Sequence, residues 1–359
     1  MSTSQARATL TVDLGKIEAN TRTLASQIPA VDIVGVTKVT CGTPEVARAM
    51  IAGGATAIGE SRLENIERLR AAGVDAPFWL LRATPPALAE MTVRLADVSL
   101  VSEVAIVEAL DRAAAAAGVR HGVLAMIDVG DLREGMLPDD LPGFLGSVAA
   151  LRHIDLLGIG TSLTCYGGVV PSEENLGELA RLAETAAVRL GRTMLVSGGM
   201  SSSIDAALAG RLPSAVDDLR IGESIILGVS TVTREPLPGL HTDALTLAAP
   251  VIECKRKPSV PHGQITRDAF GRTPVFEDRG VRWRAICALG RQDAPAEGLR
   301  PLDPGVRVLG ASSDHLILDV DDLPRPPAIG ETIEFVPDYS AALALFTSPY
   351  VVKVFAAQR

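Results

Sequence analysis

The sequence is poor in aromatic residues and in cysteine, and it has no apolar run long enough to span a bilayer. Aromatic side chains make up 3% of the 359 residues, so each of the three tyrosines is more informative than usual. The four cysteines are scattered without the spacing of metal ligands, so neither disulfides nor a metal centre are expected. No membrane partner is expected either.

Positive charge is also in short supply. The formal net charge is −9 at pH 7, which argues against a nucleic-acid partner and leaves a small molecule as the expected one. The first residues, MSTSQARATLTVDLGKIEAN, lack the apolar core of a signal peptide. These features together predict a cytoplasmic protein.

What the sequence does contain is a repeated alternation of apolar strands and amphipathic helices. Hydrophobic residues make up 47% and charged residues 21%, typical of a globular protein, and the length suits about two domains. The strand-then-helix pattern predicts a parallel (β/α)8 barrel, with a doubly wound open sheet as the alternative. The strand candidates are Val34–Lys38, Thr56–Glu60, Phe78–Arg82, Val98–Ser102, Val123–Asp128, Leu156–Ser162, Met194–Ser197 and Leu219–Glu223.

After about Ser230 the pattern changes to short β-rich segments separated by Pro and Gly. Such segments are typical of an antiparallel β domain. We therefore expect a barrel over residues 11–230 and a β domain over residues 231–359, joined by an amino-terminal strand within residues 1–10. The strand candidates of the β domain are Val251–Cys254, Trp283–Leu289, Val306–Leu309, Leu316–Val320 and Thr332–Val336.

A lysine stands where the first barrel strand ends. In IVGVTKVTCG, residues 33–42, apolar residues lead to Lys38, and Thr43 and Pro44 then suit the N-cap and first turn of a helix. A buried cation is costly unless it is paired or neutralised, and a lysine driven toward the neutral amine is a candidate nucleophile for an aldehyde. The alternative is a lysine that leans out into water.

Two glycine-bearing stretches follow the seventh and eighth strands, where barrels commonly bind phosphate. SGGMSSSID, residues 197–205, offers a flexible backbone, hydroxyls and a helix start, and RIGES, residues 220–224, offers further backbone donors. Each alone is compatible with an ordinary capped turn. Together with Lys38 they indicate a ligand with a phosphate at one end and an aldehyde at the other, the shape of pyridoxal 5'-phosphate.

Several stretches carry a resemblance to a known family. In chain order they are VTKVTCG, TSLTCYGG, SGGMSSS, LRIGESIILG, KPSVP, ALGRQD, GASSDHLILD and DYSAALALFTSPYVVK. They resemble the alanine/ornithine racemase group of fold type III pyridoxal-phosphate enzymes, and within it most of all the ornithine racemases. The resemblance covers nearly the whole chain, so it implies a (β/α)8 barrel followed by a mostly antiparallel β domain.

The resemblance also implies roles for particular residues. Lys38 would hold the cofactor as a Schiff base, and Arg220 would contact the pyridine nitrogen. A guanidinium always keeps its protons, so it can donate to that nitrogen without protonating it, which leaves a weaker electron sink and suits racemisation. Arg133 and Arg291 would approach the substrate. The other cofactor-binding residues implied are Thr161, Ser197, Ser201, Ser202, Gly222, Glu223 and Tyr339. The alternative for Arg220 is a surface arginine that pairs with a neighbouring aspartate.

Racemisation needs proton exchange on both faces of one carbon. Lys38 can serve one face, and in alanine racemases a tyrosine of the partner subunit serves the other. Here the corresponding segment reads ALGRQD, with Arg291 near that place, so a different group is expected. Asp314 and His315, on a β-domain turn that could enter a neighbour's barrel, are the first candidates. The alternatives are Arg291, Asp293, Cys165 and Tyr166.

The chain is therefore expected to be a pyridoxal-phosphate-dependent racemase of a basic amino acid such as ornithine, working as a head-to-tail homodimer. Acidic residues near the barrel mouth would hold the cationic side chain: Glu60, Asp131, Glu134 and Glu223. The alternatives are a racemase of alanine or of many amino acids, and a non-catalytic carrier of pyridoxal phosphate. The β domain argues against a carrier, for which a lone barrel is enough. A decarboxylase is disfavoured because it normally places an acid at the ring nitrogen.

Overall fold

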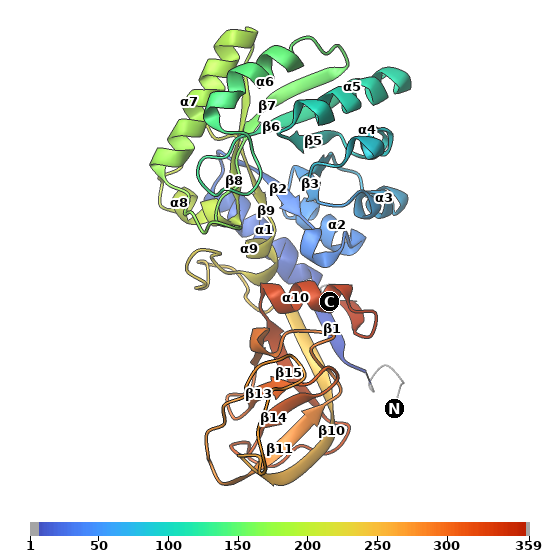
Figure 1. Ribbon diagram of the computed structural model, residues 1–359, viewed down its shortest axis with the longest axis vertical. Helices are drawn as coiled ribbons and strands as arrows, with labels where there is room; N and C mark the ends of the chain where they lie inside the picture. The colour runs from blue at the N-terminus through green and yellow to red at the C-terminus, as the bar shows by residue number, and fades with distance from the viewer. Residues whose placement is uncertain (1–6, 357–359) are drawn as a thin grey trace. The chain divides into compact units, whose positions relative to one another are not determined.

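The computed structural model describes residues 7–356, which form two compact units (Figure 1). One unit is Leu14–Thr242, and the other combines residues 7–13 with residues 243–356. These limits differ from those expected because residues 231–242 contact the first barrel helix. Asn20 Nδ2 donates to the carbonyl of His241 at 2.9 Å, and Gln27 Nε2 donates to that of Pro238 at 3.0 Å. The expected strand within residues 1–10 lies partly outside the described residues.

The first unit is a closed parallel barrel, which confirms the predicted fold class. Its strands follow one another round the barrel in chain order, and pairing of β2 with β9 closes the ring. The strands are β2 (Asp32–Val36), β3 (Ala57–Glu60), β4 (Phe78–Leu80), β5 (Val98–Val101), β6 (His121–Met126), β7 (Ile154–Gly160), β8 (Leu195–Met200) and β9 (Asp218–Ile221). The helices are α1 (Leu14–Gln27), α2 (Pro44–Ala52), α3 (Leu63–Ala71), α4 (Ala89–Leu95), α5 (Val104–Ala117), α6 (Leu141–Val148), α7 (Glu173–Leu190), α8 (Ile204–Leu208) and α9 (Glu223–Leu227).

The barrel strands are apolar on both faces because each is covered by helices outside and by other strands' side chains inside. Val34, Trp79, Leu100 and Met126 belong to one buried cluster supplied by β2, β4, β5 and β6. Two strands also approach closely at a glycine, which has no side chain. A Cβ on Gly158 would lie 1.9 Å from the carbonyl oxygen of Leu195, so glycine is what lets β7 pair with β8 here.

The second unit is a mostly antiparallel sheet with the strand order β12-β15-β10-β11-β14-β13. The amino-terminal strand β1 (Thr9–Asp13) pairs antiparallel with β10 and parallel with β16. The other elements are β10 (Leu245–Pro258), β11 (Val281–Cys287), β12 (Leu299–Pro301), β13 (Arg307–Ala311), β14 (Leu316–Asp319), β15 (Thr332–Pro337), α10 (Tyr339–Thr347) and β16 (Val352–Ala356). The sequence did not predict β12, β16 or α10.

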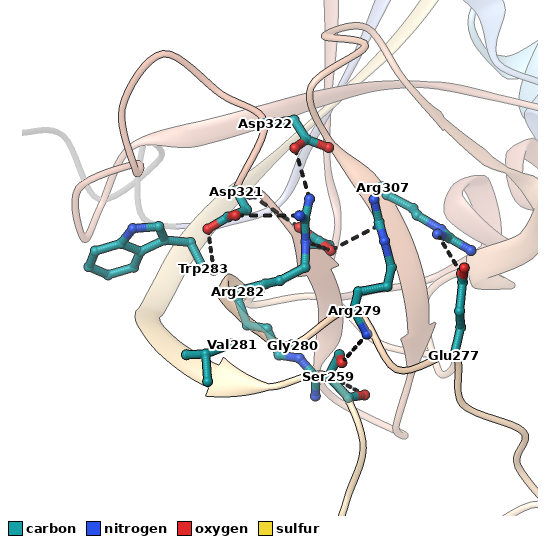
Figure 2. Close-up of polar contacts among 12 residues, drawn as sticks. Ser259, Glu277, Arg279, Gly280, Val281, Arg282, Trp283, Arg307, Asp321 and Asp322 are labelled. Carbon is teal, nitrogen blue, oxygen red and sulfur yellow. Dashed lines mark hydrogen bonds and ion pairs between the residues drawn. The ribbon is translucent and has the colours of Figure 1, made fainter.

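Arginine and aspartate side chains tie β11 to the turn after β14 (Figure 2). Arg282 lies 2.6 Å from Asp319 and 2.9 Å from Asp322, and Arg279 lies 3.2 Å from the same Asp319 carboxylate. The backbone N–H of Trp283 donates to Asp321 at 2.9 Å. The carboxylates raise the pKa of Arg282 through these hydrogen bonds. This network gives the charged residues near β11 a structural role within the sheet.

Candidate active site

Lys38 lies two residues beyond the end of β2, at the start of a short 3-10 turn, Lys38–Thr40, and it is partly buried. The turn is fixed on both sides. The buried Thr37 donates its hydroxyl to the carboxylate of Glu60 at 2.8 Å. Gly42 adopts a φ of +62°, and a Cβ there would lie 2.6 Å from Cβ of Asn65. The amine is therefore carried by a backbone segment with little freedom to shift.

Glu60 closes β3 and is fully buried. Besides the hydroxyl of Thr37, its carboxylate accepts the N–H of Ser61 at 2.9 Å and Nδ2 of Asn65 at 3.0 Å. Burial raises the pKa of Glu60 above its ordinary value, and these hydrogen bonds oppose that shift. The three donors make Glu60 the clamp that joins β3 and α3 to the turn that bears Lys38.

Arg220 on β9 is buried, with 3% of its surface exposed, so it is not the surface arginine of the alternative interpretation. It lies opposite Val34 of β2 in the strand register and therefore faces the barrel interior. Its guanidinium donates to Ser197 Oγ and to the carbonyl of Thr161, with Ser162 Oγ at 3.4 Å. Burial lowers the pKa of this guanidinium and raises the pKa of the adjacent Asp218 to about 6.

The serine and glycine stretches after β8 and β9 meet beside the end of β2. Ser201 Oγ accepts the N–H of Gly222 at 3.2 Å and that of Ser224 at 3.4 Å. A Cβ on Gly222 would lie 2.9 Å from the carbonyl oxygen of Val36. Ser202 is buried and donates to the carbonyl of Leu163 at 3.4 Å. The structure thus gathers most of the predicted barrel residues around Arg220: Thr161, Ser197, Ser201, Ser202 and Gly222.

Two buried polar atoms in this cluster have no protein partner. Among the side chains that the structure describes, Thr161 Oγ1 and Asp218 Oδ2 are buried without a hydrogen bond. Buried polar atoms normally have a partner, so these atoms suit a site that is completed by a ligand. An amine, a buried guanidinium and loops of Ser and Gly at strand ends fit a ligand with an aldehyde and a phosphate. Across residues 7–356 no cluster of three or more His, Cys, Asp or Glu could hold a metal.

The acidic residues expected near the mouth mostly have other partners. Asp131 is buried and accepts the N–H groups of Thr164 at 2.9 Å, Tyr166 at 3.0 Å and Val169 at 3.3 Å. It thereby pins the loop after β7, a role that the sequence gave no sign of. Glu223 lies 2.5 Å from Arg234.

Arg133, expected near the substrate, lies in the loop after β6 and pairs with Glu134 at 2.5 Å. About a third of each side chain is exposed, 32% and 38%. This pair is close enough to Arg220 to affect its pKa. Of the four acidic candidates, Glu134 is thus the one that combines exposure with nearness to Arg220.

The predicted residues of the second unit divide into a cluster and one separate residue. The turns around Arg291 and Asp314 pack together, since the N–H of Arg291 donates to the carbonyl of Ser312 at 2.9 Å. Asp314 and His315 are exposed there. The guanidinium of Arg291 pairs with Glu297 at 2.6 Å and lies over the ring of Phe270. Tyr339 is the first residue of α10 and is partly buried.

The first unit therefore carries a lysine and loops of Ser and Gly close to the carboxyl ends of its strands, where barrel enzymes build their active sites. Comparison with known proteins makes this specific. Residues 12–229 match the family described as the alanine racemase N-terminal domain. Lysine racemase of Thermotoga maritima is 39% identical over 96% of this chain and 98% of its own length. Ornithine racemase of Acetoanaerobium sticklandii is 36% identical over the same shares.

Solved structures agree on the fold. Alanine racemase from Streptomyces coelicolor superposes with a TM-score of 0.76 at 23% identity, covering 98% of both chains. The alanine racemase from Bartonella henselae, solved with covalently bound pyridoxal phosphate, gives 0.76 at 18% identity, covering 98% of this chain and 99% of its own. The chain belongs to the alanine racemase family, and the family resemblance expected from the sequence is confirmed.

Proposed function

We propose that this protein is a pyridoxal-phosphate-dependent racemase that interconverts the L and D forms of a basic amino acid, with ornithine and lysine as first candidates. One observation carries the proposal: relatives named lysine and ornithine racemase match 96% of the chain, and alanine racemases match shorter stretches of it at lower identity. The barrel supports it with a lysine and a buried arginine at strand ends.

The residues divide the work by position. Lys38 would hold the cofactor and exchange the Cα proton on one face of the substrate. Arg220 would donate to the ring nitrogen, and its burial beside Ser197 and Thr161 fixes its direction. Ser201, Ser202, Gly222 and Glu223 would lie near the phosphate, and Tyr339 would help to hold the cofactor. When bound, the cofactor supplies an electron sink for the carbanion at Cα.

The substrate class can be tested by turnover. Purified protein loaded with cofactor is incubated with single L-amino acids, and the D form is measured by chiral chromatography. We expect ornithine and lysine to be converted well ahead of alanine. The Arg133–Glu134 pair offers a carboxylate for the cationic side chain, so Glu134→Gln should lower kcat/KM for ornithine more than for alanine. A preference for alanine in the unmodified protein would contradict the assignment.

The role of Lys38 has its own test. Lys38→Ala should lose the visible absorption band of the bound cofactor, whereas Lys255→Ala should keep it, because Lys255 is an exposed lysine on β10 that pairs with Glu253. If the Lys38 variant keeps the band after dialysis, the assignment of Lys38 is wrong.

We further propose a head-to-tail homodimer in the cytoplasm. The exposed turn of Asp314 and His315, packed beside Arg291, is the surface that a second copy would use to approach the barrel mouth, where Arg291 would contact substrate. None of the four cysteines, all within residues 7–356, forms a disulfide, which suits a reducing compartment. Analytical ultracentrifugation of the cofactor-loaded protein tests the dimer, and a monomer at micromolar concentration would contradict it. Among residues 7–356 no helix is long and apolar enough to cross a membrane.

A further inference from the structure

The loop after β7 places a thiol at the barrel mouth. Cys165 is exposed, and its thiol lies 3.2 Å from Sδ of Met200, the last residue of β8. Met200 pairs in the strand register with Arg220 on β9. The thiol is also near enough to the guanidinium of Arg220 to influence its pKa. A chain of contacts within the first unit thus connects Cys165 to the centre of the candidate site.

The same loop holds the unsatisfied hydroxyl of the site. Thr161 is fully buried, its carbonyl accepts from Arg220, and its Oγ1 has no partner. Cys165 follows four residues later. Asp131 fixes the backbone on both sides of the cysteine through the N–H groups of Thr164 and Tyr166. The thiol therefore has a defined place in the loop that also carries Thr161.

Cys165 and Lys38 both follow the carboxyl ends of barrel strands, but of different strands. Counting round the closed barrel from β2, which leads to Lys38, β7 is reached through β9 and β8 in one direction and through β3 to β6 in the other. Because the two residues come from separate strands at one end of the barrel, they can approach a bound substrate carbon from different sides. Racemisation by two groups requires this arrangement.

Other ionisable groups of this loop region are less suitable. Asp131 is buried and accepts three backbone N–H groups. Glu134 is paired with Arg133. Tyr166 is exposed too, with 76% of its surface accessible, but it is the thiol of Cys165 that contacts Met200 beside Arg220. Asp314 and His315 belong to the other unit, where they lie on an exposed turn.

We propose that Cys165 is the second proton carrier of the racemase, acting on the face of Cα opposite Lys38. This inference rests on the proposed racemase function. In one direction the amine of Lys38 takes the Cα proton, and the electron pair of the broken C–H bond stays with the carbon. The S–H bond of Cys165 then breaks, its proton joins that electron pair on the other face, and a thiolate remains. In the reverse direction the thiolate takes the proton and protonated Lys38 returns one. Water at the exposed thiol moves the proton back between turnovers.

Isotope exchange tests this assignment. Cofactor-loaded wild type, Cys165→Ser and the control Cys254→Ser are incubated in D2O with L-ornithine or D-ornithine, or with whichever amino acid the wild type racemises. NMR measures loss of the Cα proton, and chiral chromatography measures inversion. We expect Cys165→Ser to lose inversion by at least about 100-fold, while Lys38 still exchanges the Cα proton of one enantiomer. The Cys254 control should match wild type.

Each result decides the question. Unchanged inversion in Cys165→Ser overturns the assignment, and so does loss of exchange with both enantiomers when the cofactor band is normal. If wild type neither inverts nor exchanges any amino acid, the racemase function itself fails, and the role of Cys165 falls with it.

Two further measurements separate Cys165 from a merely structural thiol and from the β-domain candidates. In the cofactor-loaded protein, substrate should slow the alkylation of Cys165 by iodoacetamide, which mass spectrometry follows. Substrate should not slow the alkylation of Cys254, which is the control. Equal alkylation rates for Cys165 with and without substrate overturn the proposal. Mixing Lys38→Ala with Cys165→Ser subunits should restore no activity, because both groups belong to one barrel. Restored activity in that mixture overturns it too.

Discussion

Replacing Asp218 with asparagine should stabilise the protein at neutral and alkaline pH, although it removes a carboxylate that faces a buried arginine. Asp218 is 2% exposed, and its Oδ1 accepts the hydroxyl of Ser197 at 2.6 Å while Oδ2 has no partner. Burial is the main cause that raises its pKa from 3.8 to about 6, and the attraction of Arg220 opposes it. Relative to the unfolded chain, the folded state therefore favours the neutral acid form of Asp218.

The magnitude follows from that pKa. A group whose pKa is raised on folding contributes stability below its unfolded pKa and loses it as pH rises through the folded pKa. A rise from 3.8 to about 6 corresponds to about 3 kcal/mol lost by pH 8. Asparagine mimics the neutral acid, so Asp218→Asn should be more stable than wild type by about 3 kcal/mol at pH 8 and by about 1 kcal/mol at pH 4.5. The attraction of Arg220 is already contained in the folded pKa.

The assay is urea unfolding of cofactor-free protein, followed by far-UV circular dichroism at both pH values. Comparison with wild type at the same pH cancels the other titrating groups. Asp75→Asn, the same substitution at an exposed position, is the matched control. An asparagine variant less stable than wild type at pH 8, or a gap that is equal at both pH values, would refute the reasoning.

Three further outcomes are expected. Glu60→Ala leaves the hydroxyl of Thr37 and two N–H donors without their acceptor, so the free energy of unfolding should fall by about 2 kcal/mol. Backbone amides near Lys38 should also exchange hydrogen for deuterium faster, as measured by mass spectrometry. Unchanged exchange would contradict the role of Glu60 in holding the Lys38 turn. Burial lowers the pKa of His121 to about 4, so wild type should lose up to about 3 kcal/mol as pH falls from 6.5 toward 4, and His121→Gln should flatten that part of a Tm-against-pH curve. Phe78→Ala empties a fully buried position and should cost about 3–5 kcal/mol in urea unfolding, with Phe78→Leu as the milder control.

The barrel could be predicted from the sequence because its signals are local. Each strand is a short apolar run followed by a helix start, and Thr43 with Pro44 marked the beginning of α2 where the structure has it. The placement of Lys38 and Arg220 at strand ends followed from those runs. The strand that leads to Lys38 ends at Val36, two residues earlier than expected, because the chain enters a 3-10 turn there.

The contacts that organise the site could not be predicted, because they join residues far apart in the chain. Glu60 and Asp131 were expected to meet a substrate cation, and the carboxylate of each instead accepts hydrogen bonds from other residues of the barrel unit. The contact of Cys165 with Met200 depends on how two loops fold over neighbouring strands. In the second unit, β12 has three residues, too few for a pattern, and β16 is defined by its pairing with β1.

The position of β1 has a consequence for how the protein is made. Its two neighbours in the sheet, β10 and β16, begin at Leu245 and Val352, so β1 leaves the ribosome before the barrel and meets its partners only after it. While the barrel is being translated, β1 therefore has no partner strand. A chain that stops before β16 leaves one edge of β1 open to pairing with other chains.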